Sequence, residues 1–333
     1  MLPASLDCPW LAEHLNALAA AHAAGRMPHG LLIHESPGAG GEWLATWIAR
    51  LLLCTSSGKK PCGVCTACRN AGENRHADLL FVKPIEESKQ IRIEQLRDLC
   101  AELALTSHQG GYKVGILSPA DSMNRFAANA LLKTLEEPSG NTVLILVASQ
   151  PSRLPATIMS RCQRINIRPP TRLESVAWLE KAKGPGDWHS VLDVIGEAPL
   201  GAIELDPVAV AKLGAETRQT LSDAVAGRID PVAVAERWSR ADLALRLMAF
   251  ENWLTERMRG QLAPGADSVE MRPGTHLPER DSVLNIRTSY ELLDRVRELK
   301  AALDSPINRS LALENVLRLL TAAAQAARSG NRG

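Results

Sequence analysis

The stretch TVLILVASQPSRLPATIMSRC, residues 142–162, decides the expected fold. Its apolar opening, 142–148, is short and lacks a polar face, which is typical of a strand buried on both sides in a parallel sheet. The polar residue Ser149, a proline-punctuated loop and a short helical turn then lead to Arg161. Ligands of such sheets bind beyond the carboxyl ends of the strands, so we expect Arg161 to lie there, facing its own site or a neighbour's.

The composition excludes several classes of protein. At roughly 150 residues per domain, the 333 residues predict two or three domains, and 45% hydrophobic residues allow a sizeable core. A net charge of +1, from 38 basic and 37 acidic residues, argues against a stand-alone nucleic-acid binder. No apolar run reaches the ~18 residues of a membrane span, and MLPASLDCPW lacks the pattern of a signal peptide. We therefore expect a cytoplasmic protein without membrane contact.

Residues 30–53 have the order strand, glycine-rich loop, helix. GLLIH at 30–34 is an apolar strand, ESPGAGGE at 35–42 is the loop, and an apolar helix begins at Trp43. This order is the setting of the phosphate-binding P-loop, G-x-x-x-x-G-K-[ST], in which the lysine reaches the β- and γ-phosphates and the hydroxyl binds Mg²⁺. The loop is therefore a candidate nucleotide site.

The loop departs from the P-loop motif at the positions that bind phosphate and Mg²⁺. Gly38 and Gly40 remain, but Glu35 replaces the first glycine, Gly41 the lysine and Glu42 the hydroxyl residue. A carboxylate there repels a triphosphate by roughly 4 kcal/mol per charge pair at ~4 Å and an effective dielectric of ~20. We therefore prefer a degenerate phosphate loop that retains the geometry of a nucleotide site over one that binds ATP.

Four cysteines have the spacing C-x7-C-x2-C-x2-C: Cys54, Cys62, Cys65 and Cys68. Four soft thiolates with no open coordination position suit a structural Zn²⁺. An iron–sulfur cluster is the alternative, although its usual downstream cysteine followed by proline is absent. We predict a zinc-binding insertion at residues 54–68.

The strand expected at 113–117 lacks the acidic residues that follow this strand in nucleotide hydrolases. Ser118 and Pro119 come next, and neither can ligate Mg²⁺ or orient water as a carboxylate does. Asp121 is expected to cap a helix over 123–136 that stops before a proline.

The periodicity changes after residue 167. Strands and helices alternate up to that point, which favours a parallel α/β sheet. A capping box, Thr171-x-x-Glu174, then opens a helical segment at 168–206, and 207–333 has helical periodicity apart from a polar loop at 263–281.

Taken together, several motifs resemble the bacterial clamp-loader family of AAA+ proteins over nearly the whole chain. They are ESPGAGGE, the inserted cysteine cluster, NALLKTLEEP at 129–138, SRC at 160–162, and SPINRSLALENVLRLL at 305–320. The resemblance implies an α/β AAA+ P-loop-like domain at 1–167, a small helical lid domain at 168–206 and an all-α collar domain for oligomerisation at 207–333.

The resemblance also implies roles for single residues. Arg161 matches the arginine finger that completes the ATP site of an adjacent subunit; an internal salt bridge is the alternative role. Ser149 matches a polar sensor, and Pro199 stands where ATPase relatives carry a lid arginine. Together with Gly41 and Ser118, Pro199 indicates a subunit that binds no ATP of its own and does not hydrolyse it.

The family implies partners as well. Such a subunit helps load the sliding clamp on primer–template DNA within a DNA polymerase III holoenzyme, a nucleotidyltransferase, at the nucleoid-associated replisome. Its expected partners are the ATPase subunits gamma and tau and the delta subunit. The alternatives are an active AAA+ ATPase of the same family and a zinc-dependent DNA-binding module.

Overall fold

The computed structural model describes residues 8–85, 90–262, 284–303, 305 and 307–330. The polar loop predicted at 263–281 lies outside the described residues. The chain divides into two compact units: a sheet unit, 1–178 with 198–200, and a helical unit, 179–197 with 201–333. The predicted three-domain division at 167 and 206 stays a prediction.

The sheet unit is built on a parallel sheet. Among the described residues, five strands pair in the order β2-β3-β4-β1-β5. The strands are β1 (Gly30–His34), β2 (Leu79–Val82), β3 (Lys113–Leu117), β4 (Thr142–Ala148) and β5 (Gln163–Asn166). All seven residues of the central strand β4 are buried, as its uninterrupted apolar sequence predicts.

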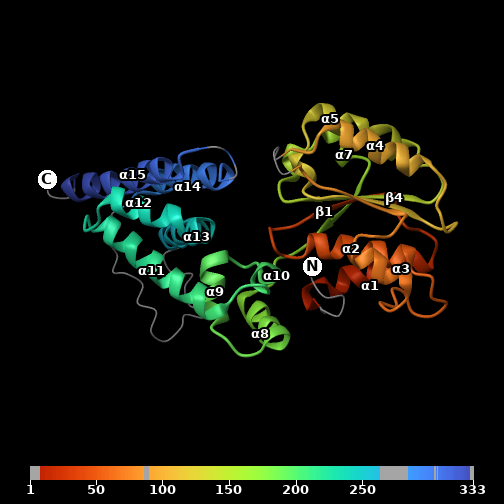
Figure 1. Ribbon diagram of the computed structural model, residues 1–333, viewed down its shortest axis with the longest axis horizontal. Coiled ribbons are helices and arrows are strands. Elements are labelled where there is room, and N and C mark those ends of the chain that lie inside the picture. The colour runs from red at the N-terminus through yellow and green to blue at the C-terminus, as the bar shows by residue number, and fades with distance from the viewer. Residues whose placement is uncertain (1–7, 86–89, 263–283, 304, 306, 331–333) are drawn as a thin grey trace. The chain divides into compact units, whose positions relative to one another are not determined.

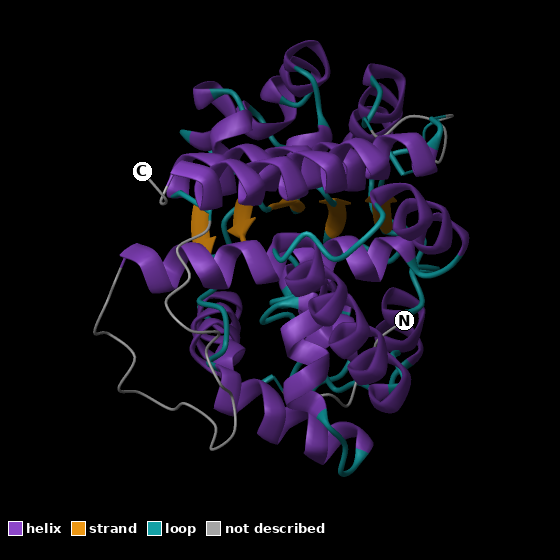
Figure 2. Ribbon diagram, turned by 90° about the vertical axis from the view of Figure 1, so that its left-hand side faces the viewer, coloured by secondary structure: helices purple, strands orange, loops and turns teal. Residues whose placement is uncertain are grey.

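Helices cover both faces of this sheet (Figures 1 and 2). One layer contains α1 (Ala12–Ala23), α2 (Gly41–Leu53) and α3 (Thr66–Gly72), and the other α4 (Ile93–Ala104), α5 (Arg125–Ala130), α6 (Leu132–Glu136) and α7 (Ala156–Met159). Alternate residues of β4, such as Leu144 and Leu146, pack with Leu96 and Leu99 of α4. The predicted fold class is confirmed in its architecture, a parallel α/β sheet with helices on both faces followed by helical segments.

The single helix expected at 123–136 is wrong in detail. Met123 has an extended backbone and forms a parallel bridge with Ile91, so it cannot begin a helix. The helix begins after Asn124, whose side chain accepts a hydrogen bond from the Ala127 N–H at 2.8 Å. The chain is then divided into α5 and α6 at Leu131.

The remaining helices follow the change in periodicity. They are α8 (Arg172–Lys183), α9 (Trp188–Ile195), α10 (Pro199–Ala202), α11 (Pro207–Val225), α12 (Pro231–Arg240), α13 (Leu243–Leu262), α14 (Ile286–Ala301) and α15 (Arg309–Gly330). The predicted capping box at the start of α8 is confirmed, because the Thr171 N–H donates to Glu174 Oε2 at 2.7 Å and the Glu174 N–H donates to Thr171 Oγ1 at 3.3 Å.

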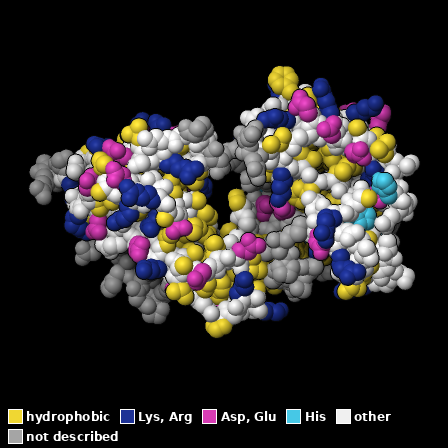
Figure 3. Space-filling model, viewed as in Figure 1, with side chains coloured by type: hydrophobic (Ala, Val, Ile, Leu, Met, Phe, Trp, Pro, Cys, Tyr) yellow, Lys and Arg dark blue, Asp and Glu magenta, His cyan; other side chains and the backbone are white. Residues whose placement is uncertain are grey.

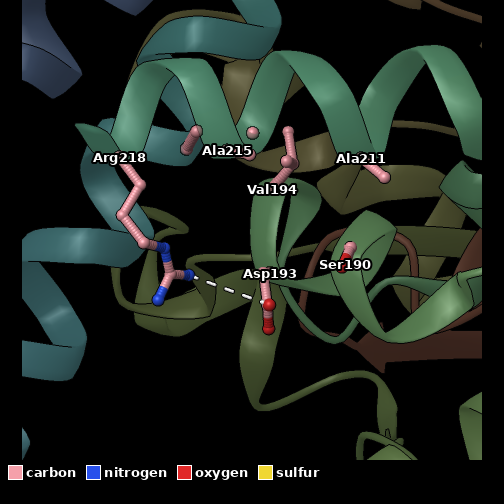
Figure 4. A pocket seen from close by; sticks show the side chains of 8 residues that line it. Ser190, Asp193, Val194, Ala211, Ala215 and Arg218 are labelled. Carbon is pink, nitrogen blue, oxygen red and sulfur yellow. Dashed lines mark ion pairs between the residues drawn. The ribbon is translucent and has the colours of Figure 1, made fainter. Parts of the chain in front are cut away.

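The helical unit has its own core and a shallow pocket. The core includes Trp238, Phe250 and Leu317, all buried. Between α9 and α11, a cavity of about 200 Å³ is lined largely by small side chains, and Figure 4 shows Arg218 beside Asp193 at its edge. Arg218 is paired with Asp193 at 3.8 Å, so this pocket offers no free guanidinium to an anion.

Basic and acidic side chains are interspersed on the face shown in Figure 3, in keeping with the net charge of +1. Within the described part of the chain, none of the helices has the length and hydropathy needed to cross a lipid bilayer.

Candidate functional site

The glycine-rich loop joins β1 to α2 at the carboxyl edge of the sheet. Gly38 and Gly40 have φ of +81° and +110°, a region that glycine adopts without strain, and Gly40 caps α2. The loop thereby aims the first N–H groups of α2 at the space where P-loops hold phosphate. The backbone part of the predicted degenerate phosphate loop is present.

The carboxylate of Glu35 occupies that space. Its Oε2 accepts hydrogen bonds from the N–H groups of Gly40 at 2.9 Å and Gly41 at 2.6 Å. Burial raises the pKa of Glu35, and so does the nearby Glu42, whereas the two N–H groups oppose the rise. The loop thus binds an anion that belongs to the chain itself.

Glu42, at the position of the Mg²⁺-binding hydroxyl, is held by two neighbours. Its Oε1 lies 2.7 Å from Lys83 Nζ, and its Oε2 accepts a hydrogen bond from Ser118 Oγ at 3.2 Å. Ser118 stands where a hydrolase would carry an acidic residue. Two of the replaced positions therefore bind each other, and the cation beside them comes from the end of β2.

Apolar residues cover the outer side of the loop within the sheet unit. A Cβ added at Gly38 would lie 2.5 Å from Ala198 Cβ, and one added at Gly40 would lie 2.9 Å from Leu200 Cδ1 and 3.2 Å from Leu11 Cδ1. Pro199, the residue at the lid-arginine position, lies between two of these covering residues. This close cover leaves little room over the loop for a phosphate chain.

Asp121 does not cap a helix, contrary to the expectation. Its Oδ2 accepts hydrogen bonds from Ser149 Oγ at 3.1 Å and the Gln150 N–H at 2.7 Å. The predicted sensor Ser149 is thereby committed to a partner on the neighbouring strand's loop. Asn124 takes the capping role instead, because the chain first forms the bridge at Met123.

Arg161 lies at the opposite edge of the sheet from the expected one. Helix α7 returns the chain to the amino edge, because β5 must start beside the start of β1 to pair in parallel. A Cβ on Gly30, the first residue of β1, would lie 3.0 Å from the Arg161 carbonyl oxygen. The phosphate loop follows the last residue of β1, four residues or about 13 Å further along at ~3.3 Å per residue. Arg161 is thus separated from its own loop by the length of the strand.

The guanidinium of Arg161 is partly exposed and paired. Its Nη2 lies 2.5 Å from Glu136 Oε1, and its Nη1 donates to the Thr157 carbonyl at 3.0 Å. About a third of the Arg161 side chain and half of the Glu136 side chain remain exposed. Exposed pairs of this kind are weak, so Arg161 can exchange this partner for another anion.

The four predicted cysteine ligands come together. The Sγ atoms of Cys54, Cys62, Cys65 and Cys68 all lie within 4.8 Å of one another, and the pairs 54–65 and 62–68 are 4.0 Å apart. A tetrahedral ion with Zn–S bonds of about 2.3 Å places its sulfurs roughly 3.8 Å apart. The cluster therefore has the size and donor set of a four-thiolate metal centre and can hold a metal ion.

The backbone around the cluster favours thiolates. The Cys65 N–H donates to Cys62 Sγ and the Cys68 N–H to Cys65 Sγ, each at 3.4 Å. Burial raises the pKa of Cys65, but hydrogen bonds from the N–H groups of Cys68 and Thr55 outweigh burial and lower that pKa to about 6. Cys54 ends α2 and Cys65 caps α3, so a bound ion would join these two helices.

Comparisons with known proteins identify the family of this chain. The family described as "DNA polymerase III, delta subunit" matches residues 10–171. "DNA polymerase III subunit delta'" of Pseudomonas aeruginosa is 34% identical over 297 residues, which cover 87% of this chain and 90% of that protein. The chain belongs to the DNA polymerase III delta-prime family. The protein of the same name from Yersinia pestis is 30% identical over 303 residues, covering 87% of each chain.

A solved structure has a more distant likeness to the chain. The gamma subunit-related protein of Thermotoga maritima is 17% identical, with a TM-score of 0.49, and the match covers 92% of this chain and 99% of that one.

Three contacts of the site are not predicted by the sequence. They are Lys83 beside Glu42, Glu136 beside Arg161, and the Gly40 and Gly41 N–H groups beneath Glu35. Only the contact of Glu35 could have been predicted from the local sequence. An acidic residue at the start of a glycine-rich loop lies within reach of the N–H groups at the end of that loop. Lys83 and Glu136 are 41 and 25 residues from their partners, and only the folded sheet brings them together.

Proposed function

We propose that this chain is the non-hydrolysing delta-prime subunit of a DNA polymerase III clamp loader. In this role it assembles with the gamma or tau ATPase subunits and the delta subunit in the cytoplasm, at the nucleoid-associated replisome. The assembled complex loads the sliding clamp on primer–template DNA during chromosome replication. Membership of the delta-prime family supports the subunit assignment, and the geometry of the site supports its part in the mechanism.

The position of Arg161 is the observation that carries this proposal. The arginine lies at one edge of the sheet, and the loop that would bind its own phosphate lies at the other. A guanidinium at a subunit boundary can neutralise the charge that develops on a transferred γ-phosphoryl group. We infer that Arg161 serves the ATP of the neighbouring subunit as an arginine finger.

The filled loop supports the second half of the proposal. Glu35 lies over the N–H groups at the start of α2, and Glu42 and Ser118 bind each other. Neither the lysine nor the acidic residues needed for phosphoryl transfer are present in this part of the chain. An active ATPase is thus the less supported alternative.

We also assign Zn²⁺ to the four-cysteine cluster. A bound zinc ion would supply a structural cross-link rather than catalysis, since four thiolates leave no coordination position for water. The cluster joins the end of α2 to the start of α3, so the ion would stabilise the helix that follows the phosphate loop. A zinc-dependent DNA-binding module is less supported, because the net charge is only +1 and basic and acidic side chains are interspersed on the face shown in Figure 3.

The test of the arginine finger is ATP turnover by the reconstituted complex. Clamp loader assembled with Arg161→Ala is expected to lose clamp- and DNA-stimulated turnover at the one site that this chain completes, by roughly 10³-fold at that site. Assembly, measured by size-exclusion chromatography with light scattering, is expected to survive, because the Arg161 side chain is partly exposed.

Two variants separate the roles of Arg161. Arg164→Ala removes an exposed arginine three residues away on β5 and is expected to leave turnover unchanged. Glu136→Gln removes the internal partner and leaves the guanidinium free. If Glu136→Gln reproduced the loss seen with Arg161→Ala, the internal salt bridge would be the function of Arg161. ATP turnover by the isolated wild-type chain would instead favour the ATPase alternative.

A further inference from the structure

The Glu35 carboxylate is bound as P-loops bind phosphate oxygens. One oxygen, Oε2, accepts from two successive N–H groups, those of Gly40 and Gly41, at 2.9 and 2.6 Å. These N–H groups begin a helix of 13 residues, whose dipole favours negative charge at this end. The contact is therefore charge-assisted as well as geometrically fitted.

The space around Gly41 is shaped by the same carboxylate. A Cβ added at Gly41 would lie 2.6 Å from Glu35 Cδ, 2.7 Å from Glu35 Oε1 and 2.9 Å from Val147 Cγ1. Any side chain at position 41, including the lysine of a P-loop, would force the Glu35 carboxylate out of its present place. The glycine at the lysine position and the glutamate at the first glycine position are thus two parts of one arrangement.

Two backbone N–H groups bind the Glu35 carboxylate. In the described ranges, Glu35 forms no salt bridge, and the charged side chain that shifts its pKa is the acidic Glu42, which raises it. A second anion arriving at the loop would meet both carboxylates and would find the N–H groups already used. The repulsion by the carboxylates and the occupation of the N–H groups would both act whether or not the loop had a lysine.

We propose that Glu35 is an internal occupant of the phosphate cradle, an autoinhibitory contact that closes the loop to the oxyanions of phosphate and polyphosphate. Removing its side chain frees the Gly40 and Gly41 N–H groups and creates a site for a tetrahedral oxyanion. The inference deepens the proposed non-hydrolysing function by naming the group that fills the loop.

Anion binding by Glu35→Ala tests the proposal. We expect inorganic phosphate and pyrophosphate to bind this full-length variant at least tenfold more tightly than the wild type, in calorimetric titrations at constant ionic strength set with chloride. Glu35→Gln keeps the space filled without the charge, so it is expected to bind as weakly as the wild type. Glu42→Ala removes a carboxylate from the same loop without freeing the N–H groups and serves as the charge control.

Each other outcome overturns the proposal. Equal, weak binding by Glu35→Ala and wild type would mean that Ala198 and Leu200 close the loop without help from Glu35. Tight binding by Glu35→Gln or Glu42→Ala would mean that charge repulsion, not occupancy, excludes phosphate. ATP turnover by the isolated wild-type chain would contradict the proposed function, whereas these titrations contradict only the role of Glu35.

A measurement on the wild-type chain tests the same contact even if Glu35→Ala fails to fold. With glycine-selective ¹⁵N labelling, the Gly40 and Gly41 amide signals are expected to shift together as Glu35 titrates. The shift is expected to be absent in Glu35→Gln, and Gly38, which donates nothing to Glu35, serves as the internal control. Amide signals that do not follow the titration would show that the carboxylate is not bound there.

Discussion

At the scale of single residues, the replaced positions of the phosphate loop depend on one another. Glu42 binds Lys83 and Ser118, and Glu35 binds the N–H groups of Gly40 and Gly41. Glu35, Glu42 and Ser118 differ from the residues of nucleotide-binding motifs, and each of these side chains has a partner within the chain. Restoring one consensus residue alone would leave such a partner unsatisfied, which costs roughly 1–3 kcal/mol for a buried group.

Two glycines with positive φ distinguish the cost of backbone strain from the cost of a steric clash. Gly38 has φ +81° and Gly110 has φ +69°, but a Cβ would meet Ala198 at Gly38 and nothing within 4 Å at Gly110. Gly110→Ala is expected to cost about 1–2 kcal/mol from the left-handed backbone alone. Gly38→Ala is expected to cost about 1–3 kcal/mol more from overpacking. Urea unfolding measures both, and equal losses would mean that the cover over the loop is loose.

The sequence predicts residue identities better than residue contacts. The four cysteines of the cluster share one short segment, so their spacing alone brings them together. Glu136 ends α6 and Arg161 follows α7, and the two meet only after the chain has returned to the amino edge of the sheet. Asp121 misled the prediction for a related reason: a local capping pattern was overruled by a partner on the adjacent strand's loop.

At the scale of elements, the cysteine cluster fixes the connection between α2 and α3. Cys62→Ser is expected to abolish the binding of about one zinc ion per chain, because a hydroxyl is a poor substitute for a soft thiolate. Cys100→Ser, outside the cluster on α4, is expected to keep the full metal content. Elemental analysis by mass spectrometry decides the matter, and iron in place of zinc would refute the assignment.

A partly buried carboxylate, that of Glu251, joins helices α13 and α14. Glu251 pairs with Arg297 at 2.7 Å and also with Lys300. Burial alone would raise the pKa of Glu251, but the hydrogen bonds from Lys300 and Arg297 outweigh burial and lower the pKa. The stability from a lowered acid pKa is present above the pKa of the unfolded chain and is lost as the pH falls through the folded value.

Glu251→Gln is therefore expected to lose roughly 1–3 kcal/mol of unfolding free energy at pH 7. The difference from wild type should shrink below pH ~4.5, where the unfolded carboxyl begins to protonate. Glu298→Gln, whose exposed pair with Arg295 is 3.0 Å long, serves as the control and is expected to change stability by at most about 0.5 kcal/mol. Urea unfolding at both pH values checks this, and a difference that grew on acidification would contradict the sign.

At the scale of the whole molecule, periodicity predicts the order of elements but not their arrangement. The apolar runs at 30–34, 113–117 and 142–148 are strands because each is too short for a buried helix and is bounded by loops. The connection from α7 to β5 depends on pairing between strands that are distant in the sequence. The local sequence therefore does not predict the edge to which the chain returns. For that reason the sequence identified Arg161 but predicted the wrong edge of the sheet.

Because Arg161 and the phosphate loop lie at opposite edges of the sheet, the two edges can have different roles in an assembly. A protein that carries its arginine at one edge and a working nucleotide loop at the other can be added head to tail, each copy serving the next. In this chain Glu35 fills the nucleotide loop at the carboxyl edge. Under the proposed function, the chain therefore supplies an arginine to one neighbouring subunit and accepts none from another. Such a subunit can end a series of ATPase subunits but cannot extend it. In a ring that includes this subunit, one subunit interface has no working ATP site.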